Sequence, residues 1–219
     1  SCRMSPRDLT IVDALLFDGR SDTLLPGGVR IADGRIVEVG DVTPGPDVIS
    51  AGGAVVTPGL IDAHFHAYAI SMITSQIENA YLSYLALAGA ARLKDALSRG
   101  FTTVRDVAGG DAGLSAAIRK GLLPSPRYLW TGAALSQTGG HGDHRGAEED
   151  LCFHGGHMCE LVDGADALRI AVRSRLHHGA HAIKIMTSGG VASLTDPIRV
   201  PQYTAEEVRA VTEEARRRG

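Results

Sequence analysis

The sequence has few of the features of disulfide-rich, membrane-spanning or nucleic-acid-binding proteins. Its 219 residues include three cysteines, too few for a disulfide framework. No run approaches the roughly 18 apolar residues needed to cross a bilayer. The 22 basic and 25 acidic residues are dispersed and give a net charge of −3. This balance excludes the basic surface that nucleic acids or acidic membranes require.

Lysine is also scarce, since only Lys94, Lys120 and Lys184 are present. A lysine inside an apolar segment, as Lys184 is, therefore stands out. The opening residues 1–4 lack the apolar segment of a secretory signal, which predicts a cytoplasmic protein, and Met4 is a plausible natural start.

Residues 1–57 are predicted to form a small β-sandwich module. Short apolar runs alternate with Asp-Gly and Pro-Gly turn signals, which is typical of hairpins. The expected strands are 9–12, 14–17, 28–31, 35–39, 48–50 and 54–56.

Residues 58–219 show a different pattern, in which strands alternate with longer helical stretches. The expected strands are 60–66, 102–107, 127–132 and 182–188, and the expected helices are 77–99, 112–120, 164–178 and 204–218. Such alternation indicates βα units and a parallel sheet, and four units make half of a (β/α)₈ TIM barrel. We therefore expect an α/β protein whose remaining half-barrel, with strands that complete the small module, is absent from this chain.

The motif PGLIDAHFH contains the strongest chemical signal. Alternate residues of a strand share a face, so Asp62, His64 and His66 are expected to point the same way while Leu60, Ile61, Ala63 and Phe65 pack in the barrel wall. Neutral imidazole is a common ligand for zinc and similar metals. The pair predicts either a metal site or two hydrogen-bonded histidines in a pocket.

Lys184 lies in the apolar segment AIKIMTS, with Ile183 and Ile185 expected to face the helices. A buried ammonium group is costly and tends to lose its proton. The neutral amine can react with carbon dioxide to give a carbamate, an anionic ligand with two oxygens. The alternative is a lysine that reaches solvent at the strand end or pairs with a carboxylate.

The motifs PGLIDAHFH, TTVRDVAG, SQTGGHGD and GAHAIKIMTSGG, in this order, resemble the amidohydrolase superfamily. They are most similar to the imidazolonepropionase-like branch, which includes Xaa-Pro dipeptidases (prolidases) and related carboxypeptidase-type and ochratoxin-hydrolysing amidases. The similarity extends from about residue 9 to the end of the chain.

The resemblance implies a site for two metal ions, usually zinc. His64 and His66 would bind one ion, and an N6-carboxylated Lys184 would bridge both. Two further histidines and the aspartate that acts as general base would follow Gly219, so the chain needs its C-terminal half and should not catalyse alone. The implied chemistry is hydrolysis of a C–N bond by a metal-activated hydroxide.

The resemblance also implies substrate contacts from His141, with His144 as a weaker candidate on the same loop. The substrate would be a dipeptide or an N-acyl amino acid, and homo-oligomers are common in the branch. For Arg105 and Asp106 we expect a structural ion pair, and for Asp62 a hydrogen-bond acceptor rather than a ligand.

A second pattern competes for metal, since Cys152, His154, His157 and Cys159 lie within eight residues. Its spacing matches no usual zinc motif, so packing of the loop is the preferred interpretation. The functional alternatives are an imidazolonepropionase-like cyclic amidase, and a non-catalytic homologue that has lost its metals.

Overall fold

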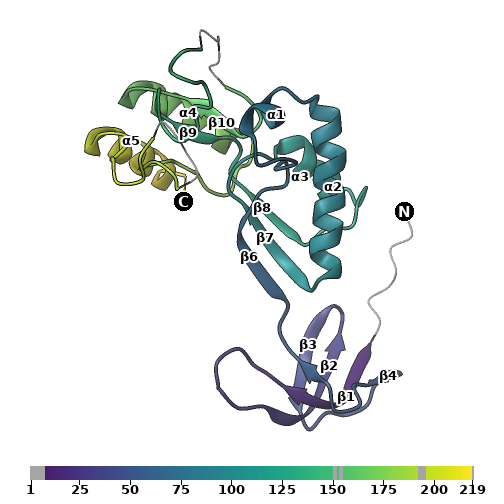
Figure 1. The fold of residues 1–219 in the computed structure, drawn as a ribbon. Coiled ribbons are helices and arrows are strands. Elements are labelled where there is room, and N and C mark those ends of the chain that lie inside the picture. The colour runs from purple at the N-terminus through teal and green to yellow at the C-terminus, as the bar shows by residue number, and fades with distance from the viewer. Residues whose placement is uncertain (1–7, 150–151, 153–154, 192–195, 219) are drawn as a thin grey trace. The chain divides into compact units, whose positions relative to one another are not determined.

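A computed structural model describes residues 8–149, 152, 155–191 and 196–218. The chain divides into two compact units, residues 1–59 and residues 60–219 (Figure 1). Cys2, Met4 and His154 lie outside the described residues. Within the described part of the chain, no helix is both long and apolar enough to cross a membrane.

The first unit contains a sheet of five strands in the order β3-β2-β1-β4, with β5 also paired to β1. The strands are β1 (Leu9–Leu16), β2 (Leu25–Ala32), β3 (Arg35–Gly40), β4 (Asp47–Ser50) and β5 (Val55–Val56). β1–β2 and β2–β3 are antiparallel, whereas β4 and β5 run parallel to β1. The predicted turn at Asp33-Gly34 connects β2 to β3, and both its residues have positive φ.

One prediction for this unit was wrong, because residues 9–12 and 14–17 form a single strand. Asp13 has a φ of 54°, and the pairing with β2 shifts between Ile11 and Ala14. This is a β-bulge, which bends a strand without ending it. The described residues form one sheet whose face leaves Ile36 and Val39 exposed. The second layer of a sandwich stays a prediction.

The second unit begins with the parallel sheet β6-β7-β8, made of β6 (Leu60–Phe65), β7 (Phe101–Asp106) and β8 (Arg127–Trp130). Helices α1 (Thr74–Glu78), α2 (Leu82–Ser98) and α3 (Ala112–Arg119) occupy the connections, and α2 packs along β7 (Figure 1). α2 buries Leu85, Gly89, Leu93 and Ala96, the three- and four-residue spacing of one helical face. The predicted helix over 77–99 is interrupted between α1 and α2.

The remainder of this unit contains β9 (Ala134–Ser136), β10 (Cys159–Leu161), α4 (Ala165–His177) and α5 (Ala205–Arg216). The short parallel strands β9 and β10 were not predicted. Helices α4 and α5 bury Leu168, Val172 and Val211 in a common apolar cluster. α5 begins after Thr204 as predicted, since Thr204 and Glu207 form a capping box.

The predicted strand 182–188 is wrong. Ile185 forms a single parallel bridge with Leu135, flanked by hydrogen bonds from Leu135 N to Lys184 O and from Met186 N to Leu135 O, each 2.9 Å long. β9 pairs with β10 over all three of its residues, whereas this segment reaches β9 at Ile185 alone, which is too short a ladder to form a strand. A mixed α/β fold is thus established, while the half-barrel stays a prediction.

Candidate metal centre

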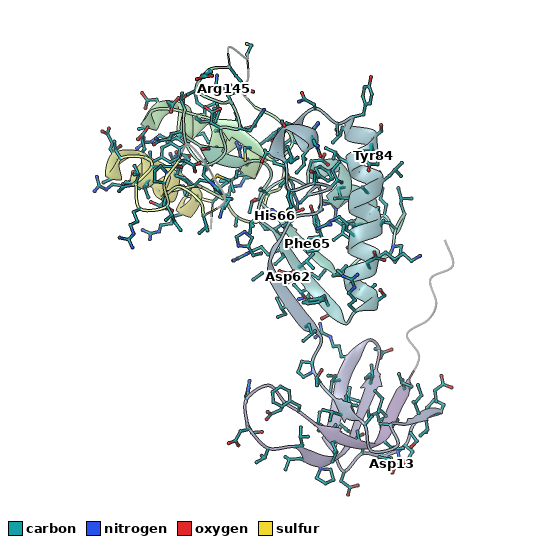
Figure 2. All side chains as sticks on the ribbon, in the orientation of Figure 1. Asp13, Asp62, Phe65, His66, Tyr84 and Arg145 are labelled. Atoms are coloured by element: carbon teal, nitrogen blue, oxygen red, sulfur yellow. The ribbon has the colours of Figure 1, made fainter. Side chains whose placement is uncertain are left out.

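β6 places two histidines next to each other at the edge of the parallel sheet. The ring centroids of His64 and His66 lie 5.1 Å apart with an interplanar angle of 72°. Both side chains, with Asp62 and Arg92, line a hollow of about 590 Å³. Figure 2 shows Asp62, Phe65 and His66 in succession along this strand. Asp62 Oδ1 accepts a hydrogen bond from His64 N at 3.0 Å, the acceptor role expected for it.

The expected packing of β6 in a barrel wall is only partly correct. Leu60 is 51% exposed and Ile61 is 69% exposed, whereas Phe65 packs against the core. β6 pairs only with β7 among the described residues, so its other edge has no partner strand to cover these side chains.

The segment 106–108 fixes the position of His66. Nδ1 of His66 lies 3.2 Å from the carbonyl oxygen of Ala108. The tautomer with its hydrogen on Nδ1 donates this hydrogen bond, and its Nε2 then has a free lone pair with which to bind a metal ion. Val107 N donates to Phe65 O at 3.0 Å, and Ala67 N donates to Asp106 Oδ2 at 3.1 Å. The backbone on both sides of His66 is therefore bonded to the end of β7.

The pKa of His66 is lowered from its usual value, mainly because the ring is partly buried. The positive charges of Lys184 and Arg92 act in the same direction. Lys184 is therefore close enough for its charge to act on the His66 ring. A lowered pKa favours the neutral imidazole that metal coordination requires.

Lys184 itself is half-buried rather than fully buried, and it does not line the hollow beside His64 and His66. Ile183 and Ile185 pack against the apolar cluster of α4 and α5, as predicted, which directs Lys184 away from that cluster. The structure brings Lys184 into the neighbourhood of His66 without showing a contact between them.

His141 lies on the loop that follows β9 and pairs with a buried acid. Its Nδ1 lies 2.9 Å from Asp196 Oδ2, and Asp196 is 7% exposed. Its backbone N donates to Oε1 of the buried Gln202 at 2.9 Å. His144, on the same loop, is half-buried, and neither histidine lines the hollow beside His66. Sequence reasoning missed Asp196 and Gln202, because neither lies in a recognisable motif.

Comparison with known protein families identifies the family of this chain. The model of the amidohydrolase family matches residues 55–219, which is most of the chain. The chain belongs to the amidohydrolase family. The resemblance inferred from the motifs is thereby confirmed.

Three relatives illustrate the similarity of this amidohydrolase chain. The ochratoxinase of Aspergillus niger is 33% identical, over 95% of this chain and 48% of that protein. A solved prolidase in complex with N-methylphosphonate-L-proline is 39% identical with a TM-score of 0.89, over 96% of this chain and 54% of its own. A solved Xaa-Pro dipeptidase with methionine bound in its active site is 29% identical with a TM-score of 0.80, over 96% and 54%. The chain thus spans about half the length of the relatives it matches.

The donor set of this amidohydrolase chain is compatible with a metal ion but incomplete. Two imidazoles share one face, and one of them is oriented through its second ring nitrogen, as metal-binding histidines commonly are. Among the described residues, however, no group of three or more His, Cys, Asp or Glu side chains is close enough to hold an ion. Further ligands would have to come from Lys184 or from groups outside the described residues.

The competing cysteine–histidine pattern does not form a zinc site within the described residues. Cys152 is exposed and Cys159 is buried. Nε2 of His157 lies 3.1 Å from the carbonyl oxygen of Ala80. Glu78 Oε1 accepts from the backbone N of Met158 and Cys159, at 3.0 and 3.2 Å, so Glu78 anchors this segment through hydrogen bonds. Loop packing stays the preferred interpretation of the pattern, since His154 lies outside the described residues.

The expected ion pair between Arg105 and Asp106 was wrong. Arg105 Nε donates to Ala63 O at 2.9 Å, whereas Asp106 is fully buried and accepts from the hydroxyl of Tyr128 at 2.8 Å. Adjacent residues of a strand point to opposite faces, so the two side chains separate. Asp106 supports the His66 segment from the helix-covered face.

Replacing Asp106 by asparagine is expected to change how stability depends on pH. Burial raises the pKa of Asp106 to about 7, so the folded protein favours the protonated carboxyl. The contribution of Asp106 to the free energy of unfolding is fully present below its unfolded pKa of about 3.9. It decreases above that pH and is lost as the pH rises through about 7. Between about pH 5 and 8 the wild type should therefore lose about 2–3 kcal/mol relative to Asp106→Asn.

Thermal unfolding at a series of pH values measures this difference. The control is Asp111→Asn, because Asp111 Oδ1 caps α3 by accepting from Leu114 N at 2.8 Å and asparagine is an equally good cap. This control shows how much of any change comes from replacing a carboxylate by an amide in this part of the fold. Parallel curves for wild type and Asp106→Asn would contradict the raised pKa.

Proposed function

We propose that the whole protein is a metal-dependent hydrolase that cleaves a C–N amide bond beside a carboxylate-bearing residue. The concrete activity is that of an Xaa-Pro dipeptidase or an N-acyl amino acid amidase. The observation that carries the proposal is the His64–His66 pair, with His66 oriented through Ala108 O at 3.2 Å. The prolidase with a bound proline phosphonate supports the choice of substrate, since it is 39% identical to this chain.

In this proposal, His64, His66 and Lys184 hold two divalent cations, with zinc as the expected ion. Addition of the Lys184 amine to carbon dioxide would form an N–C bond and release a proton, and the oxygens of the resulting carbamate would serve as ligands. Once bound, the cations supply a water of lowered pKa and polarise the scissile carbonyl. His141 contacts the carboxylate of the substrate, with His144 beside it as a further contact.

The catalytic aspartate and the other metal ligands are proposed to lie in sequence that follows Gly219. The relatives are about twice as long as this chain, which supports that proposal. The same sequence would pair with the open edge of β6 and cover Leu60 and Ile61. Catalysis thus requires the whole protein.

A substrate panel tests the proposed reaction. The whole protein, loaded with zinc, is incubated with Met-Pro, N-acetyl-L-methionine and imidazolonepropionate, and the released amine is quantified. We expect turnover of the dipeptide or the N-acyl amino acid. Ring opening of imidazolonepropionate alone would favour the cyclic-amidase alternative, and a zinc-loaded protein that hydrolyses none of the three would favour the non-catalytic one.

A further inference from the structure

The loop that carries His141 is held at its backbone by two buried polar side chains. Gln202, 4% exposed, accepts from His141 N at 2.9 Å, and Ser136, fully buried, accepts from Gly142 N at 2.9 Å. Burial of these acceptors makes the hydrogen bonds costly to lose. The main chain at His141 is therefore fixed independently of its ring.

The ring of His141 is fixed separately, between Asp196 and Gly190. Asp196 Oδ2 lies 2.9 Å from His141 Nδ1 and also accepts from Gly190 N at 3.2 Å. A Cβ atom on Gly190 would lie 2.0 Å from Cε1 of His141, so the backbone at Gly190 lies directly against the ring. One buried carboxylate thus connects the GGHGD loop to the SGG loop that follows Lys184.

We infer that Asp196 is a positioning residue that determines specificity for substrates with a free carboxylate. This inference rests on the proposed function, in which His141 contacts that carboxylate. The hydrogen bond between Asp196 and Nδ1 favours the tautomer with its hydrogen on Nδ1. It also holds the imidazole in one orientation. The His141 side chain is 38% exposed while that of Asp196 is 6% exposed, so the histidine is reachable by a ligand and its partner is not.

A competing explanation is that Asp196 only connects two loops. Asp163 offers a matched comparison, because it fastens the same His141 loop at its beginning. Its Oδ1 accepts from Thr138 N at 3.0 Å and its Oδ2 from Thr138 Oγ1 at 2.6 Å. Asp163 is exposed and has no hydrogen bond to His141 among the described contacts. A purely connecting role would make the two acids behave alike.

The experiment compares Met-Pro with its C-terminal amide, Met-prolinamide, on the whole zinc-loaded protein. For Asp196→Asn we expect KM for Met-Pro to rise about tenfold or more, with kcat within about twofold, and little change for the amide. The acid-to-amide ratio of kcat/KM should fall accordingly. Gly190→Ala, which displaces the ring and leaves Asp196 in place, should lower the same ratio, whereas Asp163→Asn should not.

Two measurements do not depend on turnover. Calorimetric titration with L-proline should show weaker binding to Asp196→Asn, by about the same factor as the rise in KM, with L-prolinamide as the comparison ligand. The ¹⁵N chemical shifts of the His141 ring should show that the tautomer preference present in the wild type is lost in Asp196→Asn.

The outcomes separate the two proposals. If the wild type hydrolyses Met-Pro but Asp196→Asn lowers the rates for acid and amide equally, Asp196 is only a structural connection and the inference is overturned. An unchanged ratio overturns it as well. If the wild type hydrolyses neither Met-Pro nor N-acetyl-L-methionine and does not bind L-proline, the proposed function fails and this inference fails with it.

Discussion

Replacing Lys184 by alanine is expected to lower the metal content of the whole protein from about two ions per chain to fewer than one, and to lower hydrolysis more than about 100-fold. Loss of a partner that only orients a metal ligand already costs about 10–100-fold in affinity or activity. Removing Lys184, which is proposed to ligate the cations itself, should cost more. His66→Ala should have a similar effect, because its ring is the one oriented through Ala108.

Elemental mass spectrometry of protein purified in the presence of zinc measures the metal content directly. Lys94→Ala is the matched control, since Lys94 is exposed on α2 and alanine is favourable in a helix. It should retain the metal and the activity of the wild type. Equal metal content in the wild type and Lys184→Ala would rule out the carbamate as a ligand. A wild type without metal would favour the non-catalytic alternative.

The parts of the fold that could be predicted from sequence are those with a local pattern. The predicted helix 77–99 includes α2, the predicted helix 204–218 includes α5, and an Asp-Gly turn signal lies at the β2–β3 hairpin. The alternation of His64 and His66 in an extended segment was enough to place both rings on one face. In each case neighbours in the sequence determine the outcome.

Two of the failures concern partners distant in the sequence. Residues 182–188 have the composition of a strand, but only Ile185 pairs with β9, a segment that carries no clear strand signal. Asp196 lies 55 residues after His141 and no periodicity connects them. Tertiary pairing of this kind is not encoded by either segment alone. The Arg105–Asp106 prediction, by contrast, contradicted strand alternation and was avoidable.

Gly110→Ala is expected to destabilise the whole protein by roughly 2–5 kcal/mol. Gly110 has a φ of 63°, which costs about 1–2 kcal/mol for a residue with a Cβ. The added Cβ would also lie 1.9 Å from Tyr128 Oη and 2.7 Å from Asp106 Oδ2, both buried, and such overpacking costs about 1–3 kcal/mol more. Thermal unfolding measures the effect as a lower transition midpoint.

Gly121→Ala separates the two contributions. Gly121 has a φ of 69° but no atom within 4 Å of the added Cβ, so alanine there incurs the backbone cost alone. The difference between the two variants is the cost of moving Tyr128 and Asp106. That cost has a functional consequence, because Asp106 Oδ2 holds the backbone N of Ala67, the residue after His66. Gly110→Ala should therefore bind zinc less tightly than Gly121→Ala even at a temperature where both are folded. Equal zinc affinity would mean that His66 keeps its position without Asp106.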